Sequence, residues 1–86
     1  MEYLSVNESL GRDNGQYVLQ FSVDDEFMAT KIGTNLLMYL RGRIGFTIDV
    51  RSVGDVVKIN YWDKKYKGII LQSIRDIMGG IEINLV

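Results

Sequence analysis

One stretch of this chain, residues 24–41, carries a long helical pattern, and the segments around it alternate with the period of β-strands. Apolar residues recur there every three or four positions, as in a helix that packs one side on a core. That stripe consists of Met28, Ile32, Leu36, Tyr39 and Leu40. Acidic residues 24–26 suit the positive N-terminal end of a helix, and Gly42 suits its stop. We therefore expect one helix among strands.

The first two strands are predicted on either side of Asn14-Gly15. This dipeptide favours a two-residue type I′ hairpin turn, because both central residues of that turn need positive φ. Folding about it pairs Leu10 with Leu19. One face of the hairpin is then apolar, and it consists of Val6, Leu10, Leu19, Phe21 and Val23.

Glu8 falls on this same apolar face. Two arrangements are open for it. A β-bulge would turn its side chain outward, or the carboxylate is partly buried and has a partner.

The second half of the chain predicts four more strands. "IGFTIDV" (44–50) alternates, with Ile48 and Val50 inward and Asp49 and Arg51 outward, and "SVGD" (52–55) turns the chain. "VVKINYW" (56–62) and "YKGIILQ" (66–72) suggest a hairpin about residues 63–65, and "IEINLV" (81–86) ends the chain. Residues 73–80 fit either a strand extension or one helical turn. The expected order is β-β-α-β-β-β-β, a single α+β domain over residues 1–86: a mostly antiparallel sheet or a partly closed barrel with one helix packed on it.

Composition excludes several function classes. The 86 residues contain no His and no Cys, which removes the usual general base and the thiolate metal ligands. No phosphate-binding, dinucleotide-binding or nucleophile-elbow motif occurs. We expect a non-enzymatic protein without cofactor, metal or evident small-molecule substrate. No apolar run is long enough to span a membrane, and the N-terminus does not resemble a signal peptide. A cytoplasmic location is therefore expected.

A basic, aromatic segment is the first candidate for binding. In "NYWDKKYKGI" (60–69), a three-residue loop places Trp62 opposite Tyr66, and a two-residue loop places it beside Lys67. Either hairpin gives a surface of rings and cations that suits single-stranded nucleic acid. The plain alternative is a cross-strand aromatic pair that only stabilises the hairpin. "GRIG" (42–45) resembles the G-x-x-G loop of KH domains in spacing, although the alternation that follows favours a helix end. The expected docking residues are Arg41, Arg43, Lys58, Trp62, Lys64, Lys65, Tyr66 and Lys67.

A second candidate lies on the predicted helix. Phe27 and Met38 are eleven residues apart, so they share one side, opposite the main stripe, with Leu37 at its edge. A helix that is apolar on two sides lies between layers or contacts another chain. We therefore expect first a protein-binding module that forms a homodimer through these residues, such as a regulator or inhibitor of a larger machine of phage type. Nucleic-acid binding is the alternative.

Overall fold

Five strands and two helices make up the described part of the chain, residues 3–12, 15–45 and 47–86 of a computed structural model. In chain order they are β1 (Tyr3–Leu10), β2 (Tyr17–Ser22), α1 (Glu26–Ile44), β3 (Ile48–Val53), β4 (Val56–Tyr61), a 3-10 turn (Lys64–Tyr66), α2 (Lys67–Ile77) and β5 (Glu82–Leu85).

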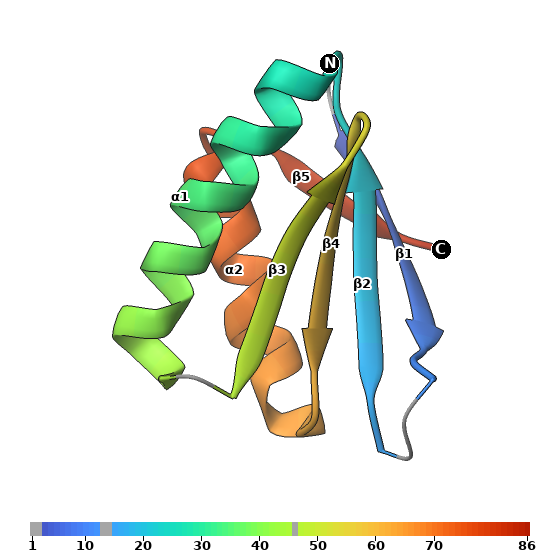
Figure 1. Ribbon diagram of the computed structural model, residues 1–86, viewed down its shortest axis with the longest axis vertical. Helices are drawn as coiled ribbons and strands as arrows, with labels where there is room; N and C mark the ends of the chain where they lie inside the picture. The colour runs from blue at the N-terminus through green and yellow to red at the C-terminus, as the bar shows by residue number, and fades with distance from the viewer. Residues whose placement is uncertain (1–2, 13–14, 46) are drawn as a thin grey trace.

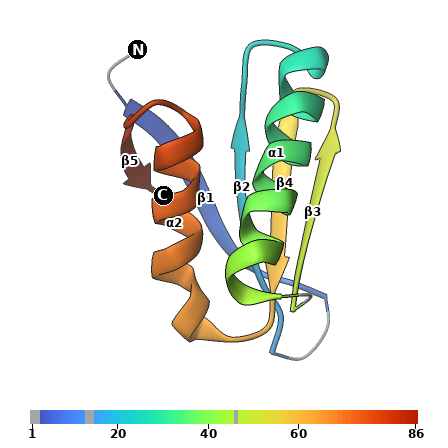
Figure 2. The same cartoon turned by 90° about the vertical axis from the view of Figure 1, so that its left-hand side faces the viewer.

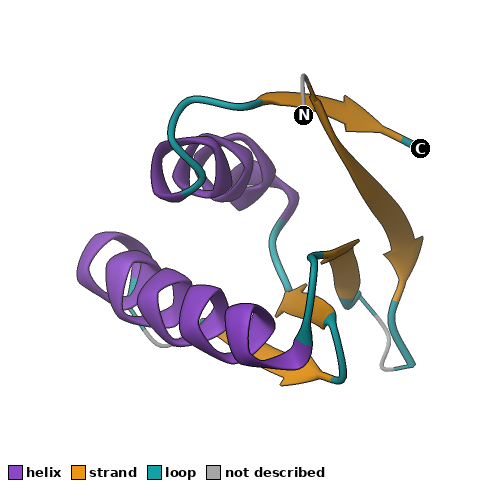
Figure 3. Ribbon diagram, turned by 90° about the horizontal axis from the view of Figure 1, so that it is seen from above, coloured by secondary structure: helices purple, strands orange, loops and turns teal. Residues whose placement is uncertain are grey.

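The strands form one mixed sheet in the order β3-β4-β2-β1-β5, in which only the β1–β5 pair is parallel. Both helices cover the same face (Figures 1 and 2), and the sheet curves around them (Figure 3). The predicted α+β class with a mostly antiparallel sheet is confirmed. The barrel alternative is wrong, because β3 and β5 form opposite edges of an open sheet.

Helix α1 begins two residues later and ends three residues later than predicted. The Asp25 carboxylate accepts a hydrogen bond of 2.7 Å from the backbone N–H of Met28, which caps the first turn. The helix continues past Gly42 and stops at Gly45, whose φ of 74° suits a residue without a Cβ. The predicted inward stripe is confirmed at Ile32, Leu36 and Leu40, which are all buried.

Residues 66–72 were predicted as a strand, and this prediction is wrong, because they belong to the 3-10 turn and α2. The apolar run "IIL" (69–71) fits a strand or a buried helix equally well. The spacing beyond it decides, since Ile70, Ser73 and Ile74 are buried at positions i, i+3 and i+4. Residues 73–77 are therefore helical, and the described part of the chain contains two α-helices rather than one.

The first hairpin forms with a longer loop than predicted. Leu10 pairs with Tyr17 and Glu8 with Leu19, two residues away from the expected register. Asn14 lies outside the described residues, while Gly15 has the predicted positive φ, 81°. A shift of two residues keeps every side chain on its predicted face. For that reason Val6, Leu19 and Phe21 are buried despite the wrong register.

The core lies between the sheet and the helices. Inward side chains alternate along the central strands, for example Leu19 and Phe21 on β2 and Val57 and Ile59 on β4, and all of these are buried. Within the described residues, no helix covers the opposite face of the sheet (Figure 2). We call it the outer face.

Candidate functional site

The outer face carries a row of polar side chains that crosses four strands. Arg51 on β3 lies opposite Lys58 on β4, Lys58 lies opposite Gln20 on β2, and Gln20 lies opposite Asn7 on β1. Since neighbouring strands lie about 4.8 Å apart, the row spans roughly 15 Å. In this row the two cationic side chains are neighbours, and the amide side chains of Gln20 and Asn7 follow them on the next two strands.

Trp62 lies beside this row in a shallow groove of the outer face. The groove is also lined by Lys58, Arg51, Asn60 and, from the β1–β2 loop, Arg12. Trp62 is the residue directly after β4, and it is 46% exposed. A large ring, three cations and several amide groups therefore meet on one concave surface.

One carboxylate belongs to this surface. Asp49 on β3 accepts a hydrogen bond of 2.8 Å from Nε of Arg51. This bond orients the guanidinium group and offsets part of the repulsion between Arg51 and Lys58, since like charges opposite one another on paired strands are destabilising.

Lys67 and Lys64 lie away from the outer face. Lys67 forms an ion pair with Glu8, and both residues line a pocket with Lys64, Tyr17 and Tyr61. The open question about Glu8 is thus settled: it has a cationic partner on the inner side of the sheet, and the pairing register of β1 contains no bulge. Its side chain is 39% exposed.

The predicted cross-strand pairing of Trp62 with Tyr66 is wrong. Because the chain turns into α2 instead of a return strand, Tyr66 is half-buried and packs against the core. Lys65 places its ammonium nitrogen 5.2 Å from the centre of the Tyr66 ring and lies 3.7 Å from a carboxylate oxygen of Asp63. Lys65 and Tyr66 thus form a small cluster of their own.

Arg41 and Arg43 occupy the last turn of α1, in the helical layer. The Arg43 guanidinium donates a hydrogen bond to the Tyr39 hydroxyl and lies 4.4 Å from the centre of that ring. Tyr39 in turn donates to Asp76 of α2 at 3.1 Å. Arg43 therefore helps to join the two helices, and of the predicted docking residues only Lys58 and Trp62 share the outer face.

The exposed apolar residues of α1 are separated. Phe27 and Met38 are 79% and 70% exposed, as an interface would require, whereas Leu37 is half-buried against the core. Lys31 and Thr34 lie on the same side of the helix between them, because four such residues at i, i+4, i+7 and i+11 form one line. The two apolar side chains therefore do not form a continuous patch.

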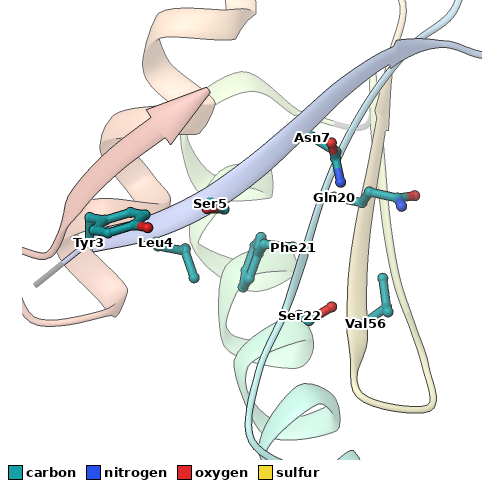
Figure 4. Close-up of a pocket in the computed structure, with 8 residues that line it drawn as sticks. All are labelled: Tyr3, Leu4, Ser5, Asn7, Gln20, Phe21, Ser22 and Val56. Atoms are coloured by element: carbon teal, nitrogen blue, oxygen red, sulfur yellow. The ribbon is translucent and has the colours of Figure 1, made fainter. Parts of the chain in front are cut away.

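A further pocket opens where β1 and β2 separate (Figure 4). The two strands pair only as far as Asn7 and Gln20, and above this point β1 pairs with β5 alone. The resulting opening, of about 420 Å³, is called the seam here. It is lined by Tyr3, Ser5 and Ser22 at its mouth, which are exposed, and by Leu4 and Phe21 at its floor, which are buried.

Within residues 3–12, 15–45 and 47–86, no group of three or more Asp and Glu residues is placed to hold a metal ion. No helix in this part of the chain is long and apolar enough to span a membrane.

Sequence reasoning missed Arg12, Arg51 and Gln20 as members of the surface. The signal for Arg51 was available, because strand alternation already placed Asp49 and Arg51 outward, and the short "SVGD" turn fixes β3 next to β4. Gln20 was not accessible in this way, since the β2–β4 pairing joins segments far apart in the sequence. Comparisons of the chain with protein-family models, with curated proteins and with solved structures find no match.

Proposed function

We propose that this chain is a small non-enzymatic binding module that takes single-stranded nucleic acid across the outer face of its sheet. The observation that carries the proposal is the adjacency of Arg51 and Lys58 beside a half-exposed Trp62. Two like charges on paired strands carry a cost that a polyanion would remove. An aromatic ring next to cations supplies a stacking platform for bases along a phosphate-binding surface.

The distribution of charge supports one orientation of such a ligand. Asp24, Asp25 and Asp55 lie where β2 ends, α1 begins and β3 turns into β4, all at the upper end of Figure 1. Trp62 and the loop with Arg12 lie at the other end, after β4 and after β1. A polyanion is repelled from the acidic end and drawn toward the groove.

Titration with oligo-dT and oligo-U at low salt tests this proposal. Trp62 is the only tryptophan, so its emission reports directly on the groove. We expect the emission to be quenched when the oligonucleotide binds. Trp62→Ala removes this signal, so its binding is measured by the fluorescence anisotropy of a labelled oligonucleotide, and it should lose about 1–3 kcal/mol of binding free energy. Lys58→Ala should lower the slope of log affinity against log salt by about 1.

Lys31→Ala is the matched control, because Lys31 is an exposed cation on α1, on the far side of the sheet. It should bind as the parent does. Unchanged Trp62 emission with both oligonucleotides at low salt would rule out the proposed function.

A second proposal is the protein-binding module with self-association, favoured by the exposure of Phe27 and Met38 on one side of α1. Aromatic residues and Met are enriched at protein interfaces. We expect a dimer in sedimentation equilibrium that Phe27→Asp and Met38→Asp dissociate, with Thr34→Asp between them doing the same. A monomer at all accessible concentrations would contradict self-association.

A further inference from the structure

The seam between β1 and β2 exposes backbone hydrogen-bonding groups on both of its sides. The N–H of Val86 donates to the carbonyl of Val6 at 2.9 Å, and the N–H of Glu8 donates to the carbonyl of Val86 at 3.1 Å. Even-numbered residues of β1 thus direct their backbone groups toward β5. Because these directions alternate along a strand, Ser5 directs its N–H and C=O toward β2.

The opposite side of the seam has the complementary arrangement. The N–H of Val23 donates to the carbonyl of Asp55 at 2.8 Å, on the β4 side. Ser22, the preceding residue, therefore directs its N–H and C=O toward β1. Among the described residues the β1–β2 register ends at Asn7 and Gln20 and does not pair Ser5 with Ser22, and both serines are exposed.

The β3 edge of the sheet differs from the seam. On β3 the residues whose backbone groups face outward include Ile48 and Val50, and these are only 3% and 7% exposed because α1 packs against this strand. A covered edge cannot accept another strand. At the seam, by contrast, β1 and β2 diverge with Ser5 and Ser22 on its two sides, as Figure 4 shows, and both residues are exposed.

We propose that the seam receives an extended peptide segment of a partner protein, which completes the hydrogen-bond ladder between β1 and β2. Only another extended backbone presents donors and acceptors at the spacing that Ser5 and Ser22 require on two sides at once. One side chain of the segment faces the apolar floor of Leu4 and Phe21. Its neighbours face outward, toward the amides of Asn7 and Gln20 at the closed end of the seam.

The test uses the full chain and a capped peptide, acetyl-Thr-Val-Thr-Val-Thr-amide, as the probe. Strand addition tolerates different sequences, since main-chain bonds supply the affinity. In the free protein the amides of Ser5 and Ser22 should exchange with solvent more than about tenfold faster than those of Asn7 and Gln20, because opening free energies fall toward zero at unpaired amides. Millimolar peptide should slow both and shift NMR signals at the seam only.

Two matched comparisons decide the mode of binding. Ser22→Pro removes a donor that faces the seam and leaves the β2–β4 ladder intact, whereas Ser22→Ala keeps the donor. Ser22→Pro should lose peptide binding, and Ser22→Ala should retain it. Slow hydrogen exchange of the Val57 amide in both variants would show that they are folded. The same peptide N-methylated at its valines should not bind.

Three results would overturn the inference. Slow exchange of Ser5 and Ser22 in the free protein would mean that the strands close on each other. Equal binding of the N-methylated peptide would mean that backbone pairing is not involved. Absence of any shift at the seam would mean that no extended segment enters it. None of these depends on Trp62 or on the oligonucleotide titration, so the two proposals fail separately.

Discussion

At the scale of single residues, Tyr61 shows the effect of its surroundings on a titratable group. Its ring is buried and stacks on Tyr17 with 5.4 Å between ring centres. Burial raises the pKa of the Tyr61 hydroxyl above its usual value of 10.0, and the nearby Glu8 carboxylate and Tyr17 raise it further. The folded protein therefore holds this proton more tightly than the unfolded chain does.

A pH dependence of stability follows from that shift. Below about pH 10 the Tyr61 hydroxyl is protonated in both the folded and the unfolded state, so it does not change the stability with pH. Above about pH 10 the unfolded chain loses this proton more readily than the folded protein, which favours the unfolded state. We expect the free energy of unfolding to fall as pH rises above about 10. Tyr61→Phe should reduce this fall in urea unfolding, and Tyr3→Phe, at an exposed position, should not. Parallel curves for parent and Tyr61→Phe would contradict the assignment.

Glu8 shows how far a single residue could be interpreted from the sequence. Its place on an apolar face was visible, but its partner Lys67 was not, because Lys67 was assigned to a returning strand. As the first residue of α2, it comes within reach of β1 instead. Because residues 66–72 were assigned to a strand instead of a helix, the sequence could not identify Lys67 as the partner of Glu8.

At the scale of elements, the interface between α1 and β3 contains a position with spare room. Gly33 is buried in α1, and a Cβ built on it would lie 3.8 Å from Cβ of Ser52, an ordinary contact distance. Gly33→Ala should therefore stabilise the protein by about 0.5–1 kcal/mol, because alanine restricts the unfolded chain and favours helix. Gly42→Ala, at an exposed position of the same helix with no atom within 4 Å, isolates the propensity effect.

Urea unfolding of the two variants separates propensity from packing. Equal gains would show that the α1–β3 contact accepts the methyl group without strain. A loss of stability in Gly33→Ala alone would show that the helix packs closer to β3 than 3.8 Å implies.

Elements with one strong periodicity were predictable, and those with two compatible periodicities were not. The stripe of α1 and the alternation of β3 each have one physical solution. For that reason the sequence correctly placed Ile32, Leu36 and Leu40 of α1 and Ile48 and Val50 of β3 in the core. The run "IIL" (69–71) fits both the strand period and the helix period, and the residue that indicates a helix comes before it in the sequence. Asp63 accepts a hydrogen bond of 3.0 Å from the N–H of Lys65, which is a helix-start contact and not a hairpin loop.

At the scale of the whole molecule, the sheet is completed by the two distant parts of the chain. Residues 3–6 of β1 pair only with β5, which comes almost eighty positions later. No local pattern specifies such a partner or its parallel direction, because strand alternation fixes faces and not neighbours. The seam is a consequence of this pairing, since residues 3–6 of β1 pair with β5 and no longer pair with β2. Neither the seam nor the full row on the outer face was therefore accessible to sequence reasoning.

The same pairing predicts that β5 is essential to the fold. Removing residues 82–86 leaves Tyr3–Val6 without a neighbouring strand and uncovers Leu4 and Val6, which are 4% and 0% exposed. Burial of each such side chain contributes about 1.5–3 kcal/mol, against a total stability of about 5–15 kcal/mol for a typical domain. We expect the thermal midpoint measured by circular dichroism to fall by about 15 °C or more.

Val86→Ala is the control for this deletion, because it removes only exposed side-chain atoms and keeps the backbone bonds to Val6 and Glu8. It should melt close to the parent. If the shortened chain also melts close to the parent, then β1 is held by the core through Leu4 and Val6 alone. In that case the upper half of β1 would have no fixed neighbour on either side, and it would be free to close on β2 at Ser5 and Ser22. Hydrogen exchange at these two amides would distinguish the outcomes, because closure protects them and fraying does not.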